Sequence, residues 1–421
     1  MDPLELDVRS EIGRLRAVMT HRPGREVDRM VPGMMSELLF EDILYGQDAR
    51  AEHDAFRSVL AVVADEVLDI STFLAEALVD DSVRMAFIQA VSYLEQLHPE
   101  TAEMLSGMSA PKLADAVIGG LEYEETFRGW RVTPLPNLLF VRDPLVVAQD
   151  GVLMGSMARV ARRREPLIME FAYGYHPRLR LKKTDRFYFD ALNRPGYLRR
   201  RTVPGLEGGD FAVLSDKVLA IGRSERTSEV AIDLLANSLI NNSSIETILM
   251  VLLPEERAMM HLDTVFSQTN HEECLVYPPF FIGEGPDVCP VIRKDLRRGH
   301  VHSELKPSLL EALAEEGIQL EPIPCGGKDP INQRREQWTD GANAVALAPG
   351  VIILYERNRY TVDELAARGY QVVHPDEVAA GKVSLDLSGP KKYVVLVEGH
   401  ELSRARGGPH CMTMPLKRDS I

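Results

Sequence analysis

Cys411 is the side chain in this sequence that is best placed to act as a nucleophile. It lies near the C-terminus in residues 404–415 (RARGGPHCMTMP), after two adjacent glycines. Glycine reaches backbone conformations that other residues adopt only with strain, so such a loop can bend to present a thiol to a bound molecule. We therefore expect Cys411 to attack a substrate covalently. The other cysteines, Cys274, Cys289 and Cys325, are expected to be small buried apolar residues.

Two short motifs hold groups that could assist this thiol. His261 and Asp263 are two residues apart, and Glu207 and Asp210 flank a pair of glycines. If the first motif lies on a strand, both of its side chains face the same way. Each motif alone also fits a structural role, either as a hydrogen-bonded core histidine or as a turn. A metal site built from all four residues is an alternative, but it would lack a second histidine.

Asp143 adds another acid, although beside Arg142 it could form an ordinary surface ion pair. Taken together, carboxylates, one histidine and one cysteine suit a planar cation. A guanidinium group has five N–H donors in one plane, and two carboxylates can hold it with paired hydrogen bonds. Its carbon is a poor electrophile in water, but exclusion of water and alignment with a thiolate would remove much of the barrier. Carboxylates raise the pKa of a nearby thiol, so the bound cation should favour the thiolate. His261 could then protonate departing ammonia and later activate water.

The composition excludes several classes of protein. The chain has 421 residues, of which 45% are hydrophobic, so it can bury a sizeable core. Its four cysteines form no C-x-x-C pair, which favours a reducing compartment over a disulfide framework and predicts a cytoplasmic location. The acidic N-terminus lacks the pattern of a signal peptide, and the apolar runs are too short to span a bilayer. A net charge of −15 argues against nucleic acid or an anionic membrane as partner and would weakly attract a cationic small molecule.

A weak internal repeat is the strongest large-scale pattern. Four segments combine an apolar run, a turn and a second apolar run, which predicts β-hairpins. They are residues 140–147 with 152–154, 211–214 with 218–221, 264–266 with 274–277, and 344–347 with 351–354. A fifth hairpin could join residues 15–19 to residues 393–397. Such units separated by helices predict the radial repetition of a propeller, in which the acids at the strand starts would meet near the axis.

Residues 71–128 break this pattern. Their apolar side chains recur at spacings of three and four, which is typical of helix faces, and they include Phe73, Leu74, Leu78, Met85, Ile88, Val91, Leu94 and Leu97. We expect an insertion of about five short helices here. Residues 1–70 and 129–421 would then form the catalytic domain.

Five motifs together resemble the arginine deiminase family of the guanidino-group-modifying superfamily. They are residues 136–144 (PNLLFVRDP), 207–210 (EGGD), 222–227 (GRSERT), 261–266 (HLDTVF) and 407–412 (GGPHCM). Their order and spacing extend over essentially the whole chain. The resemblance implies an α/β fold, a five-bladed pseudo-symmetric (pentein-like) propeller with a helical-bundle insertion. It also implies hydrolysis of L-arginine to L-citrulline and ammonia through a covalent thiouronium intermediate, without a metal or an organic cofactor.

The resemblance also implies roles for individual residues. Cys411 would be the nucleophile and His261 the general acid and then the general base, with Glu207 tuning His261. Asp143 and Asp263 would hold the guanidinium group. The other residues expected to bind arginine are Asn137, Phe140, Arg226 and Arg406, joined by one of Arg162, Arg163 and Arg164. Asp210 fits either a catalytic or a structural role.

Ala405 and Pro409 depart from the family pattern, because they occupy a loop that is often richer in glycine. We expect them to affect the rate of loop closure more than the type of reaction. Alternatives remain: an amidinotransferase, which passes the amidino group to an amine; a deiminase of another guanidino acid; a non-catalytic binding protein; and a metal hydrolase. Agmatine lacks the carboxylate that Arg226 and Arg406 would bind. A homo-oligomer, a dimer or tetramer, is expected only because such symmetric assemblies are common.

Overall fold

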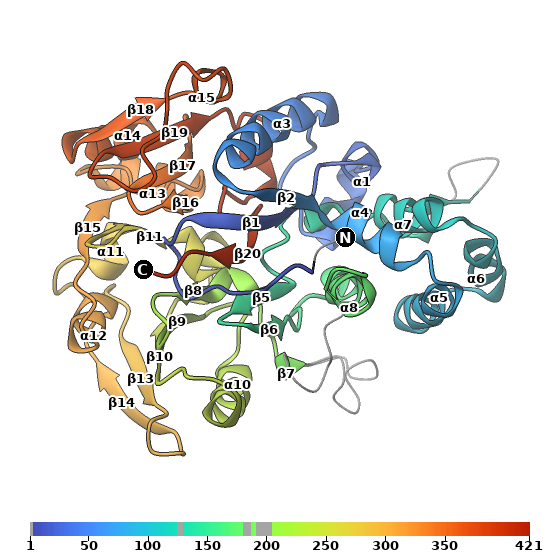
Figure 1. Ribbon diagram of the computed structural model, residues 1–421, viewed down its shortest axis with the longest axis horizontal. Coiled ribbons are helices and arrows are strands. Elements are labelled where there is room, and N and C mark those ends of the chain that lie inside the picture. The colour runs from blue at the N-terminus through green and yellow to red at the C-terminus, as the bar shows by residue number, and fades with distance from the viewer. Residues whose placement is uncertain (1–2, 124–128, 180–186, 191–203) are drawn as a thin grey trace.

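Five sheets with a shared strand pattern form the centre of the computed structural model, which describes residues 3–123, 129–179, 187–190 and 204–421 (Figure 1). In each sheet an antiparallel pair is followed by a strand parallel to one member of the pair. The five sets are β20 (Met414–Arg418), β1 (Leu15–Thr20) and β2 (Glu66–Asp69); β5 (Leu145–Ala148), β6 (Gly151–Met154) and β7 (Phe187–Asp190); β8 (Phe211–Val213), β9 (Val218–Arg223) and β10 (Thr247–Leu252); β11 (Phe266–Asn270), β12 (Glu273–Val276) and β15 (Glu321–Pro324); and β16 (Val345–Ala348), β17 (Val351–Tyr355) and β19 (Lys392–Val397).

Other strands extend two of these sheets. The β10 edge continues into β13 (Val291–Asp295) and β14 (His302–Lys306), and β18 (Tyr370–Val373) lies beside β19. A separate two-stranded sheet pairs β3 (Leu121–Glu122) with β4 (Trp130–Val132).

The four predicted hairpins are confirmed. Strands β5–β6, β8–β9, β11–β12 and β16–β17 are antiparallel pairs. The predicted fifth pairing is wrong, because β1 pairs with β20 while β19 joins β17. Because β20 contains Pro415, its sequence does not predict a strand, but β20 lies at a sheet edge, where proline is tolerated. The apolar pattern of β19 is stronger, yet periodicity does not identify a strand's partner.

Helices cross from the second strand of each hairpin to the parallel third strand, as a parallel pairing requires. The longer ones are α3 (Gly46–Val63), α8 (Arg164–Tyr175), α10 (Glu229–Asn242), α12 (Leu309–Glu315) and α14 (Arg359–Ala367). Figure 1 shows α3, α10 and α12 at the periphery of the sheets. Short helices complete the connections: α1 (Arg25–Asp28), α2 (Met35–Leu38), α11 (Pro278–Phe281) and α15 (Pro375–Ala379). Helix α13 (Pro330–Trp338) instead lies between β15 and β16, where one repeated sheet is followed by the next. In the described ranges, no helix has both the length and the apolar character that a bilayer crossing requires.

Residues 70–119 form helices that gather at one end of the molecule (Figure 1). They are α4 (Ile70–Ala77), α5 (Asp81–Glu95), α6 (Pro99–Ser106) and α7 (Ala110–Gly119), so this described stretch holds four helices where about five were expected. Residues 124–128 of the predicted insertion lie outside the described residues. Carboxylates of Asp69 and Asp80 accept backbone N–H bonds at the starts of α4 and α5. Met85 does not join the buried face, since 44% of its surface is exposed.

The helices at residues 70–119 share their hydrophobic core with the sheets. Phe87 of α5 and Phe171 of α8 belong to the same buried cluster as Val147 of β5, and the two rings lie 5.0 Å apart in an edge-to-face contact. Helix α8 therefore anchors this end of the molecule to the β5–β6 sheet.

Replacing Phe87 by alanine should lower the free energy of unfolding by about 3–5 kcal/mol, because it removes a fully buried ring from this junction. Urea denaturation would measure the loss. Met85→Ala on the exposed side of the same helix is the control and should change stability by less than about 0.5 kcal/mol. Equal unfolding of Phe87→Ala and the wild type would show that α5 is not docked as described.

Candidate active site

The segments that precede the first strands of the repeated sheets bring the predicted catalytic residues together. Asp143 precedes β5, and Glu207 precedes the short helix η5 (Gly208–Asp210) that leads into β8. His261 and Asp263 lie at η7 (Leu262–Thr264), before β11, and Cys411 lies before β20. All five side chains are buried, with at most 4% of each residue exposed. Of the acids expected at strand starts, Asp143, Asp263 and Asp340 all lie close enough to Cys411 to act on its thiol.

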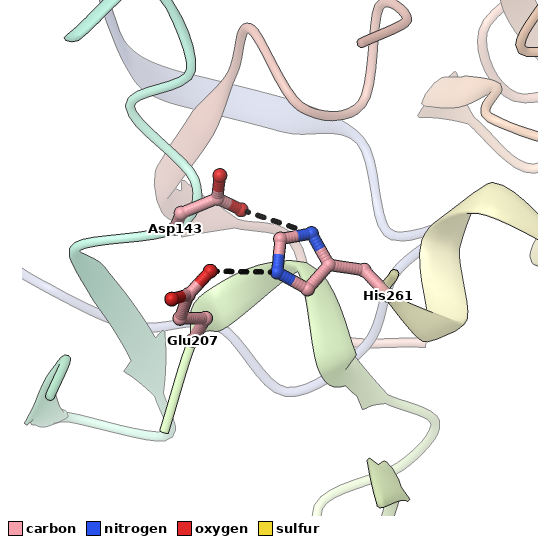
Figure 2. Close-up of side chains that lie close together, drawn as sticks. All are labelled: Asp143, Glu207 and His261. Atoms are coloured by element: carbon pink, nitrogen blue, oxygen red, sulfur yellow. Dashed lines mark hydrogen bonds and ion pairs between the residues drawn. The ribbon is translucent and has the colours of Figure 1, made fainter. Parts of the chain in front are cut away.

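His261 lies between two carboxylates (Figure 2). Its Nε2 is 2.9 Å from Glu207 Oε2, and its Nδ1 is 3.6 Å from Asp143 Oδ1. Burial alone would lower the pKa of His261, but the charge of Asp143 and the hydrogen bond to Glu207 outweigh it and raise the pKa to about 9. The imidazole is therefore protonated at neutral pH and can donate a proton.

Glu207 stays ionised in spite of its complete burial. Burial would raise the pKa of Glu207, but the nearby charge of Arg226 and the hydrogen bond with His261 lower it to about 2. Arg226 Nη1 lies 3.5 Å from Glu207 Oε2 and Arg162 Nη1 lies 3.9 Å from the same atom. Glu207 thus holds His261 and keeps it charged.

The Cys411 thiol faces one acceptor and one donor. Its Sγ lies 3.3 Å from Asp263 Oδ2 and 3.2 Å from Asn343 Nδ2. Burial raises the pKa of the Cys411 thiol well above its usual value, and the negative charges of Asp263, Asp143 and Asp340 raise it further. The group is therefore a neutral thiol until positive charge reaches the site.

Asp263 is held by a chain of hydrogen bonds that the sequence did not reveal. Its Oδ2 lies 2.9 Å from His410 Nδ1, and His410 Nε2 lies 3.2 Å from Glu11 Oε2. Burial would raise the pKa of Asp263, but the hydrogen bond from His410 and its charge lower it. The position of His410 beside Cys411 was the only available signal, since no motif connects Glu11 with the site.

His261 and Asp263 do not share the face of a strand, contrary to that interpretation. His261 is the residue before η7, and Asp263 lies inside that short helix. Their side chains consequently reach different partners, Glu207 for His261 and His410 for Asp263. The two residues do belong to one site, but a short helix and not a strand places them there.

Arg162 is the member of the arginine run that reaches the cavity. Its guanidinium lies 2.6 Å from Asp143 Oδ2 and 2.7 Å from Glu165 Oε2. Arg164 instead donates to the Thr133 carbonyl group. Burial raises the pKa of Glu165 to about 7; the charge of Asp143 acts in the same direction, and the charge of Arg162 opposes both.

A small cavity borders Cys411 and His261. Its lining also includes the predicted substrate-binding residues Asn137, Phe140, Arg226 and Arg406. Its volume is about 20 Å³, which is room for roughly one water molecule. The arginine expected from the sequence would need more space, so binding it would require surrounding side chains to move. Leu39 and Arg406, which both line the cavity, have left-handed backbone with φ of 62° and 67°.

The two predicted carboxylate-binding arginines differ in their present contacts. Arg226 Nε and Nη1 are buried and have no hydrogen-bond partner among the described residues. Arg406 lies with its guanidinium carbon 3.6 Å from the centre of the Trp338 ring and donates to the carbonyl groups of Trp338 and Ala258. Asn137 donates to the Leu38 carbonyl group at 2.5 Å.

Asp210 has the contacts of a structural residue. Its carboxylate accepts hydrogen bonds from the Ser224 hydroxyl at 2.7 Å and from the Leu262 backbone N–H at 3.0 Å. Burial raises the pKa of Asp210 to about 7. Through Leu262 it fixes the backbone that follows His261.

The metal alternative fits the geometry poorly. Asp143, Glu207 and His261 could each offer one ligand atom within 4.8 Å of one another. However, Arg162 is paired with Asp143 and Arg226 with Glu207, so positive charge already neutralises these carboxylates. Neither Asp210 nor Asp263 belongs to this group, which removes two members of the set considered from the sequence.

Comparison with known proteins identifies the family of this chain. The sequence profile described as arginine deiminase matches residues 36–121 and 120–418. The chain belongs to the arginine deiminase family. Arginine deiminase of Oenococcus oeni is 35% identical over 438 residues, covering 99% of this chain and 98% of its own. Arginine deiminase of Bacillus cereus strain ATCC 10987 is also 35% identical, with 99% of each chain covered.

Solved structures show the α/β fold, which is of the pentein type. An amidinotransferase of saxitoxin biosynthesis from Microseira wollei superposes with a TM-score of 0.52 at 14% identity, covering 99% of this chain and 98% of that one. The N-terminal domain of ArgZ, covalently bound to a reaction intermediate, gives 0.50 at 14% identity, with 96% and 98% covered.

Glu207→Gln should lower the pKa of His261 from about 9 by at least about one unit, since a charged acceptor becomes neutral. The raised pKa of His261 stabilises the folded state fully below pH 6.5, and this contribution is lost as pH rises through 9. The Glu207→Gln variant should therefore lose this stabilisation at a lower pH than the wild type does. NMR titration of the histidine resonances would measure the midpoint.

The control for Glu207→Gln is Glu26→Gln, which removes the buried carboxylate 3.1 Å from His21. It should lower the pKa of His21 and leave His261 unchanged. If His261 titrates identically in Glu207→Gln and the wild type, the assigned electrostatic coupling is wrong.

Proposed function

We propose that this protein hydrolyses L-arginine to L-citrulline and ammonia through a covalent thiouronium intermediate on Cys411. The observation that carries the proposal is the pair of buried carboxylates near the thiol. Asp143 and Asp263 each keep one oxygen, Oδ1, without a hydrogen-bond partner among the described residues. A guanidinium group has N–H donors for both oxygens. Family membership supports the same activity.

Substrate binding would activate the nucleophile. Cys411 is a thiol in surroundings rich in negative charge, and a guanidinium cation held by Asp143 and Asp263 would compensate that charge. The thiol then loses its proton to solvent water, since His261 already carries one, and the thiolate adds to the guanidinium carbon. Binding and activation are thereby coupled, so that the thiolate forms mainly when it has a substrate to attack.

His261 would transfer protons in both halves of the reaction. The imidazolium donates a proton to the departing nitrogen, the carbon–nitrogen bond breaks, and ammonia leaves a positively charged thiouronium group on Cys411. The neutral imidazole then accepts a proton from water as the oxygen adds to the carbon. Collapse of this adduct breaks the carbon–sulfur bond and releases citrulline. Because Nε2 is bonded to Glu207, Nδ1 is the ring nitrogen that would exchange these protons.

Arg226 and Arg406 would bind the α-carboxylate at the other end of the substrate. Beside its ion pair with Glu207, Arg226 has buried N–H groups that make no hydrogen bond to the described residues, and a carboxylate could replace the carbonyl groups that Arg406 now contacts. Asn137, Phe140 and Arg162 complete the proposed lining. Another guanidino acid would use the same groups. An amidinotransferase would share the first half-reaction and differ in the acceptor.

We also propose that the five repeated sheets form one propeller. The shared pattern of five sheets in the described residues supports a five-bladed propeller, in which β20 and β1 from the two ends of the chain complete one blade. Helices α4–α7 would be a helical insertion between residues 71 and 128, and the remainder the catalytic domain. We also propose a homo-oligomer and a cytoplasmic location, the latter supported by four free, buried cysteines.

Incubation of EDTA-treated protein with L-arginine and no added amine should yield citrulline and ammonia in equal amounts. Cys411→Ser should reduce turnover by at least about 10⁴-fold while retaining the fold, because a hydroxyl at this position has no base strong enough to ionise it. Circular dichroism would check the fold, and Cys289→Ser is the control that should keep activity. Ornithine formed only when glycine or another amine is present would establish an amidinotransferase, and loss of activity with EDTA would favour a metal hydrolase.

Arg406→Ala should raise the KM for L-arginine by about tenfold or more, since it removes a charged donor to the carboxylate. The KM for agmatine, which lacks that carboxylate, should change little. Steady-state kinetics with both substrates would measure the difference. Arg404→Ala is a matched control, because Arg404 pairs with Asp42 and Glu401 outside the cavity. Equal changes for the two substrates would refute the carboxylate assignment.

A further inference from the structure

Asn343 contacts the sulfur of Cys411 from the start of the fifth repeated sheet. It lies two residues before β16, as Asp143 lies two residues before β5. Its side chain is completely buried, and its Nδ2 is 3.2 Å from Cys411 Sγ. The repeated sheets therefore contribute an amide to the reacting sulfur as well as the carboxylates and the histidine.

The hydrogen bonds of Asn343 determine the orientation of its amide. Its Oδ1 accepts the backbone N–H groups of His410 at 3.1 Å and of Cys411 at 3.2 Å. Its Nδ2 donates to the Asp263 carbonyl oxygen at 3.0 Å as well as to the sulfur. A flipped amide would place N–H against N–H and oxygen against oxygen, so the donor must face Sγ.

The backbone around Cys411 leaves little room for this amide to move. A side-chain carbon added at Gly408 would lie 2.6 Å from Asn343 Oδ1, which is too close for any non-glycine residue without a shift. The two hydrogen bonds from backbone N–H groups and the one to the Asp263 carbonyl oxygen thus hold the amide in place. Its remaining N–H is directed at sulfur before any substrate binds. Such a preset donor needs no reorganisation when charge develops on the atom that it faces.

We propose that Asn343 is a further catalytic residue, whose amide N–H donates to the Cys411 thiolate when the nucleophile forms and again when it leaves the thiouronium carbon. The inference rests on the proposed function. Around the sulfur, Asp263, Asp143 and Asp340 all oppose a negative charge. Asn343 supplies a neutral donor at contact distance, and hydrogen bonds to an ionised acceptor are about twice as strong as neutral ones.

The resting and reacting states would use different bonds at the same sulfur. In the thiol state S–H can donate to Asp263 Oδ2, while Sγ accepts from Asn343. When the guanidinium engages Asp263, the thiol proton passes to solvent water and the hydrogen bond from the Asn343 amide to sulfur becomes charge-assisted. Hydrolysis reverses this sequence, because water becomes bonded to the carbon and the electron pair of the carbon–sulfur bond returns to sulfur.

Two substitutions separate this bond from the other contacts of Asn343. Asn343→Asp retains an oxygen for the backbone N–H groups of His410 and Cys411 but replaces the donor by an acceptor. Asn343→Ala removes the donor without adding charge. Both variants should alkylate Cys411 with iodoacetamide about tenfold or more slowly at pH 8, and both should lower kcat by about tenfold or more while KM stays within about threefold. Mass spectrometry would assign the alkylated cysteine.

Asn358→Asp and Asn358→Ala are the matched controls. Asn358 is equally buried in the same part of the chain, but its amide bonds Thr339 and not the sulfur. The controls should keep the alkylation rate and kcat near wild type, with thermal denaturation to confirm folding. If one Asn343 variant does not fold, the other decides by the same readouts.

Three results would overturn the inference. In the first, both readouts stay unchanged in folded Asn343 variants. In the second, only one of the two variants changes. A change in Asn343→Asp alone would assign the effect to the added charge, and a change in Asn343→Ala alone would assign it to the lost hydrogen bonds from the backbone. In the third, the Asn358 controls change as much. Alkylation requires no turnover, so a wild-type protein that forms no citrulline would contradict the proposed function while this assay still tests the bond to sulfur.

Discussion

The buried charges at the strand starts have to neutralise one another, and the arrangement of the site follows from that constraint. An ionised carboxylate removed from water loses several kcal/mol of solvation unless a partner compensates it. Here Asp143 and Glu207 are matched by Arg162, Arg226 and the protonated His261. Each partner comes from a different part of the chain, so the charge balance is complete only when the repeated sheets have assembled.

Around the sulfur, negative charge is not fully compensated, and this affects the reactivity of the thiol. Asp263 and Asp143 impose negative potential on a thiol that cannot easily ionise against it. A cationic substrate supplies the missing positive charge, so the nucleophile would become reactive on binding. A preformed thiolate would be oxidised and alkylated readily, whereas a buried neutral thiol reacts more slowly.

The two ends of the chain meet at the nucleophile. Strand β20 follows Cys411 directly and pairs with β1, while Glu11 before β1 supports His410 and, through it, Asp263. Arg418 donates to the carbonyl groups of Gly13 and Ala346, which ties the same strand to the sheet that carries Asn343. Placement of the sulfur thus depends on contacts between the two ends of the chain, and not on the glycine-rich loop alone.

The sequence by itself determined the hairpins, the helical character of residues 71–119 and the types of group in the site. Turn residues and apolar alternation act over short distances, so they identify β5–β6 or β16–β17 without knowledge of the rest of the fold. The resemblance of five motifs to one family indicated the reaction, since each motif carries residues whose chemistry is specific. Tertiary structure decided which groups touch. The pairing of β1 with β20 and the contact of Glu11 with His410 join the two ends of the chain. The choice of Arg162 from three adjacent arginines and the contact of Asn343 with Cys411 depend on closer segments, which still come from different secondary-structure elements. Local pattern carries no information on such pairings, because burial and charge compensation are settled only when those segments pack together.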